Sequence, residues 1–191
     1  MKKIIAIIMT IFLCSFAAFA DDQGDEYDDG YVYEINGAGD QIMKMEIGCF
    51  LPINFAKQLK PGASLGITYL RFIDSSIALG GGIQLTTNLS IGNKTFITLP
   101  IYFTMMYQPT IDKLEFPLEV SVGGSLHTMA SISYFPALSL KGSAGAYYRF
   151  SETWSAGLTA AYTWSPEWVK EKSKNFNGMF STVSLNVRYH F

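Results

Sequence analysis

Residues 178–191, GMFSTVSLNVRYHF, alternate between two kinds of side chain. The odd-numbered positions are largely apolar, among them Val183 and Leu185, whereas from Thr182 to His190 every even-numbered position is polar. Successive side chains of a β-strand point to opposite faces, so a period of two residues is typical of a strand with one apolar and one polar face. This stretch therefore predicts a long β-strand.

The same period of two continues back to Gln41 and predicts seven further strands. The eight predicted strands cover residues 41–51, 63–73, 77–89, 95–107, 114–127, 136–150, 154–164 and 178–191. One face of these strands comprises 47 positions without a charge, and the other face consists mostly of Gly, Ser and Thr. Small residues suit the narrow interior of an eight-stranded barrel, so the apolar face is expected to point outward.

Seven charged residues interrupt the polar face and are expected to lie in the barrel lumen. They are Lys44, Glu46, Glu115, Glu119, Lys141, Arg149 and Arg188. A buried charge without a partner is costly, so we interpret them as a structural network that fills the barrel, with Glu119 pairing with Lys141 on the next strand. The alternative interpretation is a pore lining that selects ions.

Composition points to a membrane protein. The chain has 191 residues, of which 49% are hydrophobic and only 16% are charged, against roughly 25% in an average soluble domain. This low charge argues against a disordered chain and against a nucleic-acid-binding protein. Beyond the N-terminus no apolar run is long enough for a membrane-spanning helix, and strands cross a bilayer only as a closed barrel. The sequence therefore predicts an all-β fold, an eight-stranded antiparallel up-and-down transmembrane β-barrel.

The N-terminus resembles a secretory signal. Lys2 and Lys3 precede an apolar run, and an A-x-A motif predicts cleavage after Ala20, so residues 1–20 are assigned to a signal peptide. Residues 21–40 carry eight acidic and no basic residues and are assigned to an acidic periplasmic segment. Within it, residues 31–36 are expected to form either a short extra strand or a strap under the barrel. Residues 41–191 form the barrel.

Turn lengths and aromatic residues suggest an orientation. Short turns at 74–76, 108–113 and 151–153 are expected on the periplasmic side, and mostly longer loops at 52–62, 90–94, 128–135 and 165–177 outside. Outward aromatic residues gather at the periplasmic strand ends, as in an interfacial girdle: Tyr107, Tyr148, Phe150, Trp154, Tyr189 and Phe191. Pro100 and Pro117 fall inside predicted strands, where bulges or a shifted register are expected.

The last strand ends on outward Val187, Tyr189 and Phe191. A C-terminal strand of this form resembles the signal that the barrel assembly machinery of the outer membrane reads. That machinery and outer-membrane lipid are therefore the expected partners of a monomeric protein.

No cofactor or metal site is predicted, because one cysteine, Cys49, follows the signal segment and no Cys/His cluster has metal spacing. Ser125 and His127 lie on one face and raise the alternative of a lipid-modifying enzyme, but both are expected in the lumen rather than toward lipid. We therefore expect no catalytic residues and no enzymatic activity.

The chain resembles the small eight-stranded outer-membrane barrel proteins of spirochaetes and, more loosely, the OmpW, OmpX and OmpA barrels. The resemblance rests on NGAGDQ at 36–41, PINF at 52–55, EFPL at 115–118, GAYYRF at 145–150 and YHF at 189–191. OmpW proteins are thought to pass small hydrophobic molecules sideways into the membrane. We therefore expect an integral protein of the bacterial outer membrane that serves envelope integrity or the narrow passage of small hydrophobic solutes. The alternative is an adhesion protein that binds a partner through its outer loops.

Overall fold

The computed structural model describes residues 36–54, 57–129, 132–167 and 176–191. These residues contain strands and turns, and none of them lies in a helix long and apolar enough to cross a membrane. The strands are β1 (Gln41–Pro52), β2 (Gly62–Phe72), β3 (Ile77–Leu89), β4 (Thr95–Tyr107), β5 (Thr110–Ile111), β6 (Leu114–Glu115), β7 (Leu118–Met129), β8 (Ile132–Arg149), β9 (Trp154–Glu167) and β10 (Phe176–His190).

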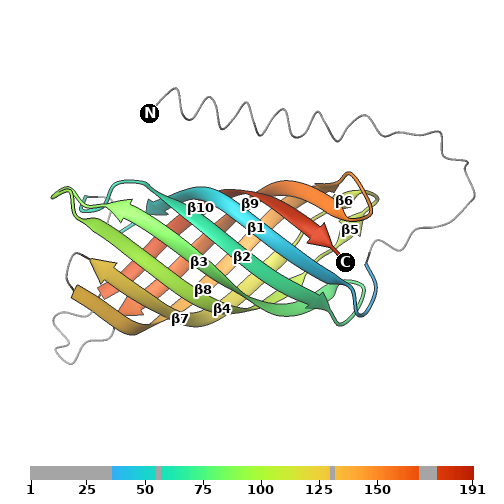
Figure 1. Ribbon diagram of the computed structural model, residues 1–191, viewed down its shortest axis with the longest axis horizontal. Helices are drawn as coiled ribbons and strands as arrows, with labels where there is room; N and C mark the ends of the chain where they lie inside the picture. Colours follow the sequence, from blue (N-terminus) through green and yellow to red (C-terminus); the bar gives the residue numbers. More distant parts are fainter. Residues whose placement is uncertain (1–35, 55–56, 130–131, 168–175) are drawn as a thin grey trace, which may run out of the picture. The chain divides into compact units, whose positions relative to one another are not determined.

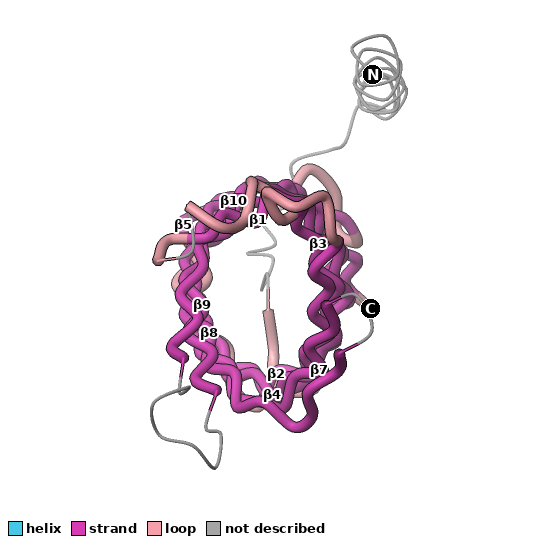
Figure 2. Tube along the Cα trace, turned by 90° about the vertical axis from the view of Figure 1, so that its left-hand side faces the viewer, coloured by secondary structure: helices cyan, strands magenta, loops and turns pink. Residues whose placement is uncertain are grey.

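The eight long strands form one closed antiparallel sheet (Figures 1 and 2). Pairing runs from β8 through β7, β4, β3, β2, β1 and β10 to β9, and β9 pairs with β8 to complete the ring. The strands cross the barrel obliquely in Figure 1, as closure of a sheet requires. The predicted eight-stranded up-and-down barrel is confirmed.

Alternate residues point into and out of the ring. On β1, for example, Lys44 and Glu46 are buried inside, whereas Met45 and Ile47 are exposed outside. The same alternation places a broad set of large apolar side chains on the outer surface, with exposed fractions between 36% and 70%. The face that the composition assigned to the outside is therefore the outer face of the barrel.

The predicted strand 114–127 is wrong in one respect, because Pro117 divides it into β6 and β7. Phe116 and Pro117 lie outside both strands, although β6 and β7 pair with β8 in one continuous register. A proline lacks the N–H that a ladder needs, which explains the break. The preceding turn also contains a short strand, β5, which pairs with β6 in a small hairpin.

The expected bulges at the prolines are also wrong. Pro100 lies opposite Ser125 in an unshifted register with β7, and the register shift of β7 against β8 falls between Ser125 and His127. The long predicted loop at 128–135 is shorter in the structure, because β7 extends to Met129 and β8 begins at Ile132. The predicted loop at 165–177 is also shorter, because β9 extends to Glu167 and β10 begins at Phe176.

The two ends of the barrel differ. At the turn end, where β1 begins and β10 ends, residues 36–40 lead into β1. Their backbone forms two hydrogen bonds with β2: Gly39 N donates to Phe72 O, and Phe72 N donates to Asp40 O. At the opposite end, here called the loop end, residues 53–61 and 90–94 connect the strands. The predicted signal peptide, most of the acidic segment and most of the segment 31–36 lie outside the described residues.

Candidate functional site

All seven predicted lumen charges point into the barrel and are buried, with exposed fractions of 8% or less. They come from β1, β6, β7, β8 and β10, each at an inward position of its strand. Every one of the seven takes part in an ion pair with another member of the set. The structure therefore brings these residues together inside the lumen.

The shortest ion pair spans the barrel. Lys44 Nζ on β1 donates to both carboxylate oxygens of Glu119 on β7, at 2.6 Å each. In the ring of eight long strands β1 and β7 lie four places apart, on opposite walls. Ser143 Oγ on β8 also donates to Glu119, at 3.2 Å. The pair therefore crosses the lumen at this level.

A second pair joins Lys141 on β8 to Glu46 on β1, at 3.3 Å. Lys141 also donates to Gln84 Oε1 at 3.3 Å and lies 5.7 Å from the centre of the Tyr102 ring. The expected pair between Glu119 and Lys141 is wrong. Glu119 and Lys141 each form their ion pair across the lumen with a residue of β1, Lys44 and Glu46 respectively.

Two arginines share one carboxylate nearer the turn end. Glu115 accepts from Arg188 Nη1 at 3.3 Å and from Arg149 Nη1 at 3.5 Å. Arg188 is fully buried, stacks 3.5 Å from the Tyr147 ring and lies 3.7 Å from Glu119. These contacts join the Lys44–Glu119 pair to the arginines in one network.

The network also holds the segment that precedes β1. Arg149 Nη1 donates to Asn36 Oδ1 at 3.3 Å, and Arg149 Nη2 donates to the carbonyl oxygen of Glu152 at 2.6 Å. Asn36 is itself buried. The C-terminal residue of the predicted segment 31–36 thus lies at the turn end of the lumen.

An apolar cluster inside the lumen was missed in the sequence. Ile42, Leu70, Phe72, Ala78 and Met106 are almost fully buried and pack together at the turn end. They occupy even-numbered positions, which belong to the polar, inward face of the predicted strands. Apolar residues at inward positions near the strand ends were the sequence feature that could have predicted this cluster. Together with the ion pairs, this cluster fills part of the lumen toward the turn end.

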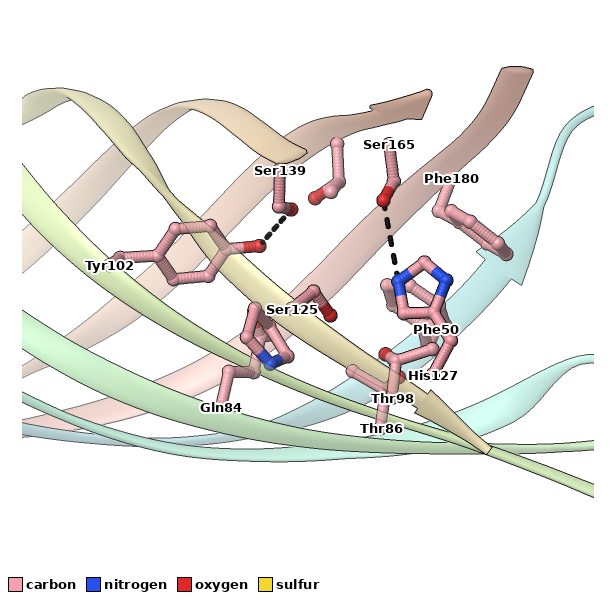
Figure 3. Close-up of a pocket in the computed structure, with 12 residues that line it drawn as sticks. Phe50, Gln84, Thr86, Thr98, Tyr102, Ser125, His127, Ser139, Ser165 and Phe180 are labelled. Carbon is pink, nitrogen blue, oxygen red and sulfur yellow. Dashed lines mark hydrogen bonds between the residues drawn. The ribbon is translucent and has the colours of Figure 1, made fainter. Parts of the chain in front are cut away.

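A small pocket with a cavity volume of about 10 Å³, room for about one water molecule, lies near the loop end (Figure 3). Phe50 and Phe180 stack at 4.6 Å on one side, near His127, while Tyr102 and Gln84 lie on the other. Leu59 packs against the two phenylalanines. The lining is mixed, because hydroxyl groups from several strands face these aromatic rings.

Ser125 and His127 both line this pocket. His127 Nε2 lies 3.4 Å from Ser165 Oγ rather than bonding Ser125, and the bulge of β7 separates the two residues. None of the twelve described residues that line the pocket carries a carboxylate that could orient the imidazole. The second histidine of the chain, His190, forms a hydrogen bond with Ser155, with 2.9 Å between Nε2 and Oγ.

The wall beside this pocket has an interruption. β3 and β4 pair from Ile77 to Ile83 and again from Thr86 to Leu89, but Gln84 and Leu85 are not paired with the facing Leu99 and Pro100. Pro100 has no N–H to donate, so the ladder cannot be complete there. Gln84 and Pro100 both line the pocket. The pocket therefore lies against the weakest part of the β3–β4 pairing.

The described residues contain no group of His, Cys, Asp and Glu side chains that could hold a metal ion. Cys49 is exposed on the outer face of β1. The chemistry of the lumen is thus that of ion pairs, hydroxyl groups and aromatic rings.

A protein-family model matches residues 23–189 of the chain. The chain belongs to this family. Two uncharacterized proteins of Treponema pallidum (strain Nichols) are similar in sequence. One is 27% identical over 177 residues, covering 83% of this chain and 80% of that protein; the other is 24% identical over 152 residues, covering 72% and 52%. The chain thus spans about half the length of the second relative.

Two solved structures share the fold. Neisserial surface protein A matches with a TM-score of 0.62 at 11% identity, covering 82% of this chain and 99% of that one. The outer membrane protein OprG from Pseudomonas aeruginosa matches with a TM-score of 0.55 at 13% identity, covering 83% and 98%. The relatives in a spirochaete and the barrel fold confirm the resemblance to a spirochaetal family of small eight-stranded barrels.

Proposed function

We propose that this protein is a non-enzymatic, monomeric integral protein of the bacterial outer membrane whose closed barrel serves envelope integrity. The observation that carries this proposal is the Lys44–Glu119 pair across the lumen, backed by the apolar cluster at the turn end. A barrel filled in this way stabilises itself without offering a continuous aqueous channel.

The outer surface supports membrane insertion. Large exposed apolar side chains occur on every long strand whose side chains are described, for example Ile47, Leu65, Phe103, Val120 and Leu185. Monomeric soluble proteins rarely expose contiguous apolar patches larger than a few hundred Å². A lipid environment removes this surface from water, and closure of the ring satisfies the backbone groups that lipid cannot.

The turn end fits the periplasmic side. Aromatic side chains cluster there: the rings of Trp154 and Tyr189 lie 4.9 Å apart, and Phe191 lies 5.6 Å from Tyr189 and 6.3 Å from Tyr69. Aromatic residues are enriched where a membrane meets water. We therefore assign this cluster to the periplasmic interface and the loop end to the outside.

A test of insertion uses the full chain expressed in a Gram-negative host. The folded barrel should remain in the membrane fraction after carbonate extraction and should migrate on a detergent gel differently before and after boiling. A protein recovered in the soluble fraction in folded form would contradict the proposal.

The interruption at Pro100 favours a second function, the sideways passage of small, largely apolar solutes. Such a solute would enter at the loop end as the side chains around the pocket move apart, and the buried ion pairs below the pocket oppose further movement along the axis. The unpaired positions of β3 and β4 beside the pocket leave the wall as the remaining route.

The variant Pro100→Val tests this second function because it restores a backbone donor and a β-branched residue. Uptake of a small apolar solute into cells that express the protein should fall in this variant, whereas the outward substitution Ile101→Val should leave uptake unchanged. Equal uptake by wild type, Pro100→Val and cells without the protein would rule out the sideways route.

A further inference from the structure

Residues 57–61 and the loop 90–94 join into one tip at the loop end. Lys60 N donates to Leu89 O at 2.7 Å, and Ile91 N donates to Gln58 O at 3.1 Å. Leu59 and Ser90 form a β-bridge between these two bonds. The tip is therefore held by backbone pairing, and the side chains on it have a defined direction.

The inward direction of Leu59 fixes which side chains of the tip face outward. Leu59 is buried against Phe50 and Phe180 inside the barrel. Its neighbours in the same extended segment point the other way, so Lys60 projects on the outer side beside Leu89. Leu89 and Ile91 are 48% and 65% exposed and continue the apolar outer face of β3. Lys60 thus stands where the apolar surface ends.

The tip has a single sign of charge. The two loops contain Lys57, Lys60 and Lys94, all exposed, and no acidic residue. The described segments at the turn end have the opposite character, because they contain one exposed lysine, Lys113, and four exposed acids. These acids are Asp40, Asp74, Asp112 and Glu152. The charge difference between the two ends is therefore built into the described connections.

We propose that the tip binds the anionic headgroups of lipids in the surrounding leaflet, with the aliphatic side chains of Leu89 and Ile91 against the acyl region and the lysine ammonium groups on the headgroup phosphates. A lysine at the edge of an apolar surface extends its charged end into the headgroup layer. Basic side chains near an anionic membrane surface each add about 1 kcal/mol of attraction, or about fivefold in affinity. This proposal rests on the insertion of the barrel into a membrane.

The test reconstitutes the full chain in phosphatidylcholine membranes with a trace of spin-labelled lipid. Electron spin resonance then gives the association of spin-labelled phosphatidylglycerol relative to spin-labelled phosphatidylcholine. We expect a preference for the anionic lipid of about fivefold at low salt, reduced toward one at high salt because the interaction is electrostatic. The triple variant Lys57→Gln, Lys60→Gln, Lys94→Gln should lose the preference, and Lys113→Gln at the opposite end should keep it.

Equal association of the two lipids with the wild-type barrel would overturn the proposal, and so would a preference that survives in the triple variant. The single variant Lys60→Glu provides a second route if the triple variant does not fold, and it should lower the preference on its own. The motionally restricted spectrum of phosphatidylcholine reports insertion independently, so a failure of lipid selectivity is distinguishable from a failure to enter the membrane.

Discussion

The ammonium nitrogen of Lys44 lies 2.6 Å from both carboxylate oxygens of Glu119, on the opposite wall of the barrel. Both side chains are almost fully buried. A pair in this position fixes the distance between two walls that share no backbone hydrogen bond. It therefore contributes to the shape of the barrel as well as to the closure of its lumen.

The variant Glu119→Gln should destabilise the barrel strongly. It leaves Lys44 without its carboxylate and removes the charge 3.7 Å from Arg188. Breaking a buried pair by removing one partner costs about 3–5 kcal/mol. Urea unfolding in lipid vesicles measures this loss. Glu152→Gln, a change at an exposed side chain of the turn end, serves as the control and should leave the midpoint unchanged.

Removing both partners should cost much less. In the double variant Lys44→Met, Glu119→Leu, no lysine at position 44 is left without its partner, and replacement of a buried pair by apolar residues is often neutral or stabilising. We expect a midpoint of unfolding well above that of Glu119→Gln. A double variant as unstable as the single one would show that the ion pair is not the source of the loss.

Two adjacent glycines on β7 should respond differently to a methyl group. A Cβ at Gly123 would lie 1.8 Å from the carbonyl oxygen of Ile101, whereas a Cβ at Gly124 would meet no atom within 4 Å. Gly123→Ala should therefore lower the folded fraction sharply, because the backbone of β4 has to move. Gly124→Ala should be tolerated. Equal folded yields of the two variants on a heat-modifiability gel would contradict the packing described here.

Much of the fold followed from the period of two, but the partners inside the lumen did not. Alternation identifies the inward positions of Lys44 and Glu119 without showing how the ring closes, so contacts between opposite walls were not predictable. Local rules suggested a pair between neighbouring strands instead. The strand breaks at Pro117 because proline lacks the backbone N–H that the ladder needs, while the register with β8 stays the same on both sides. The alternation of side chains is unchanged by such a break and does not predict it.

The aromatic end of β10 should matter for assembly more than for packing. We propose that Val187, Tyr189 and Phe191 form the signal that the barrel assembly machinery reads, and Phe191 is 51% exposed on the outer face. Phe191→Ala should lower the amount of folded barrel in the outer-membrane fraction. Phe103→Ala, at a similarly exposed position on β4, should have a smaller effect. Equal losses would indicate a general need for outward aromatic residues.

The closure of the lumen is tested most directly by electrical recording of the purified full chain in a planar lipid bilayer. The wild-type barrel should insert without opening steady ion-conducting channels, because the ion pairs and the apolar cluster fill its interior. The variant Lys44→Ala, Glu119→Ala should show increased conductance, since two of the side chains that cross the lumen are gone. Steady, long-lived channels in the wild-type protein would contradict the account.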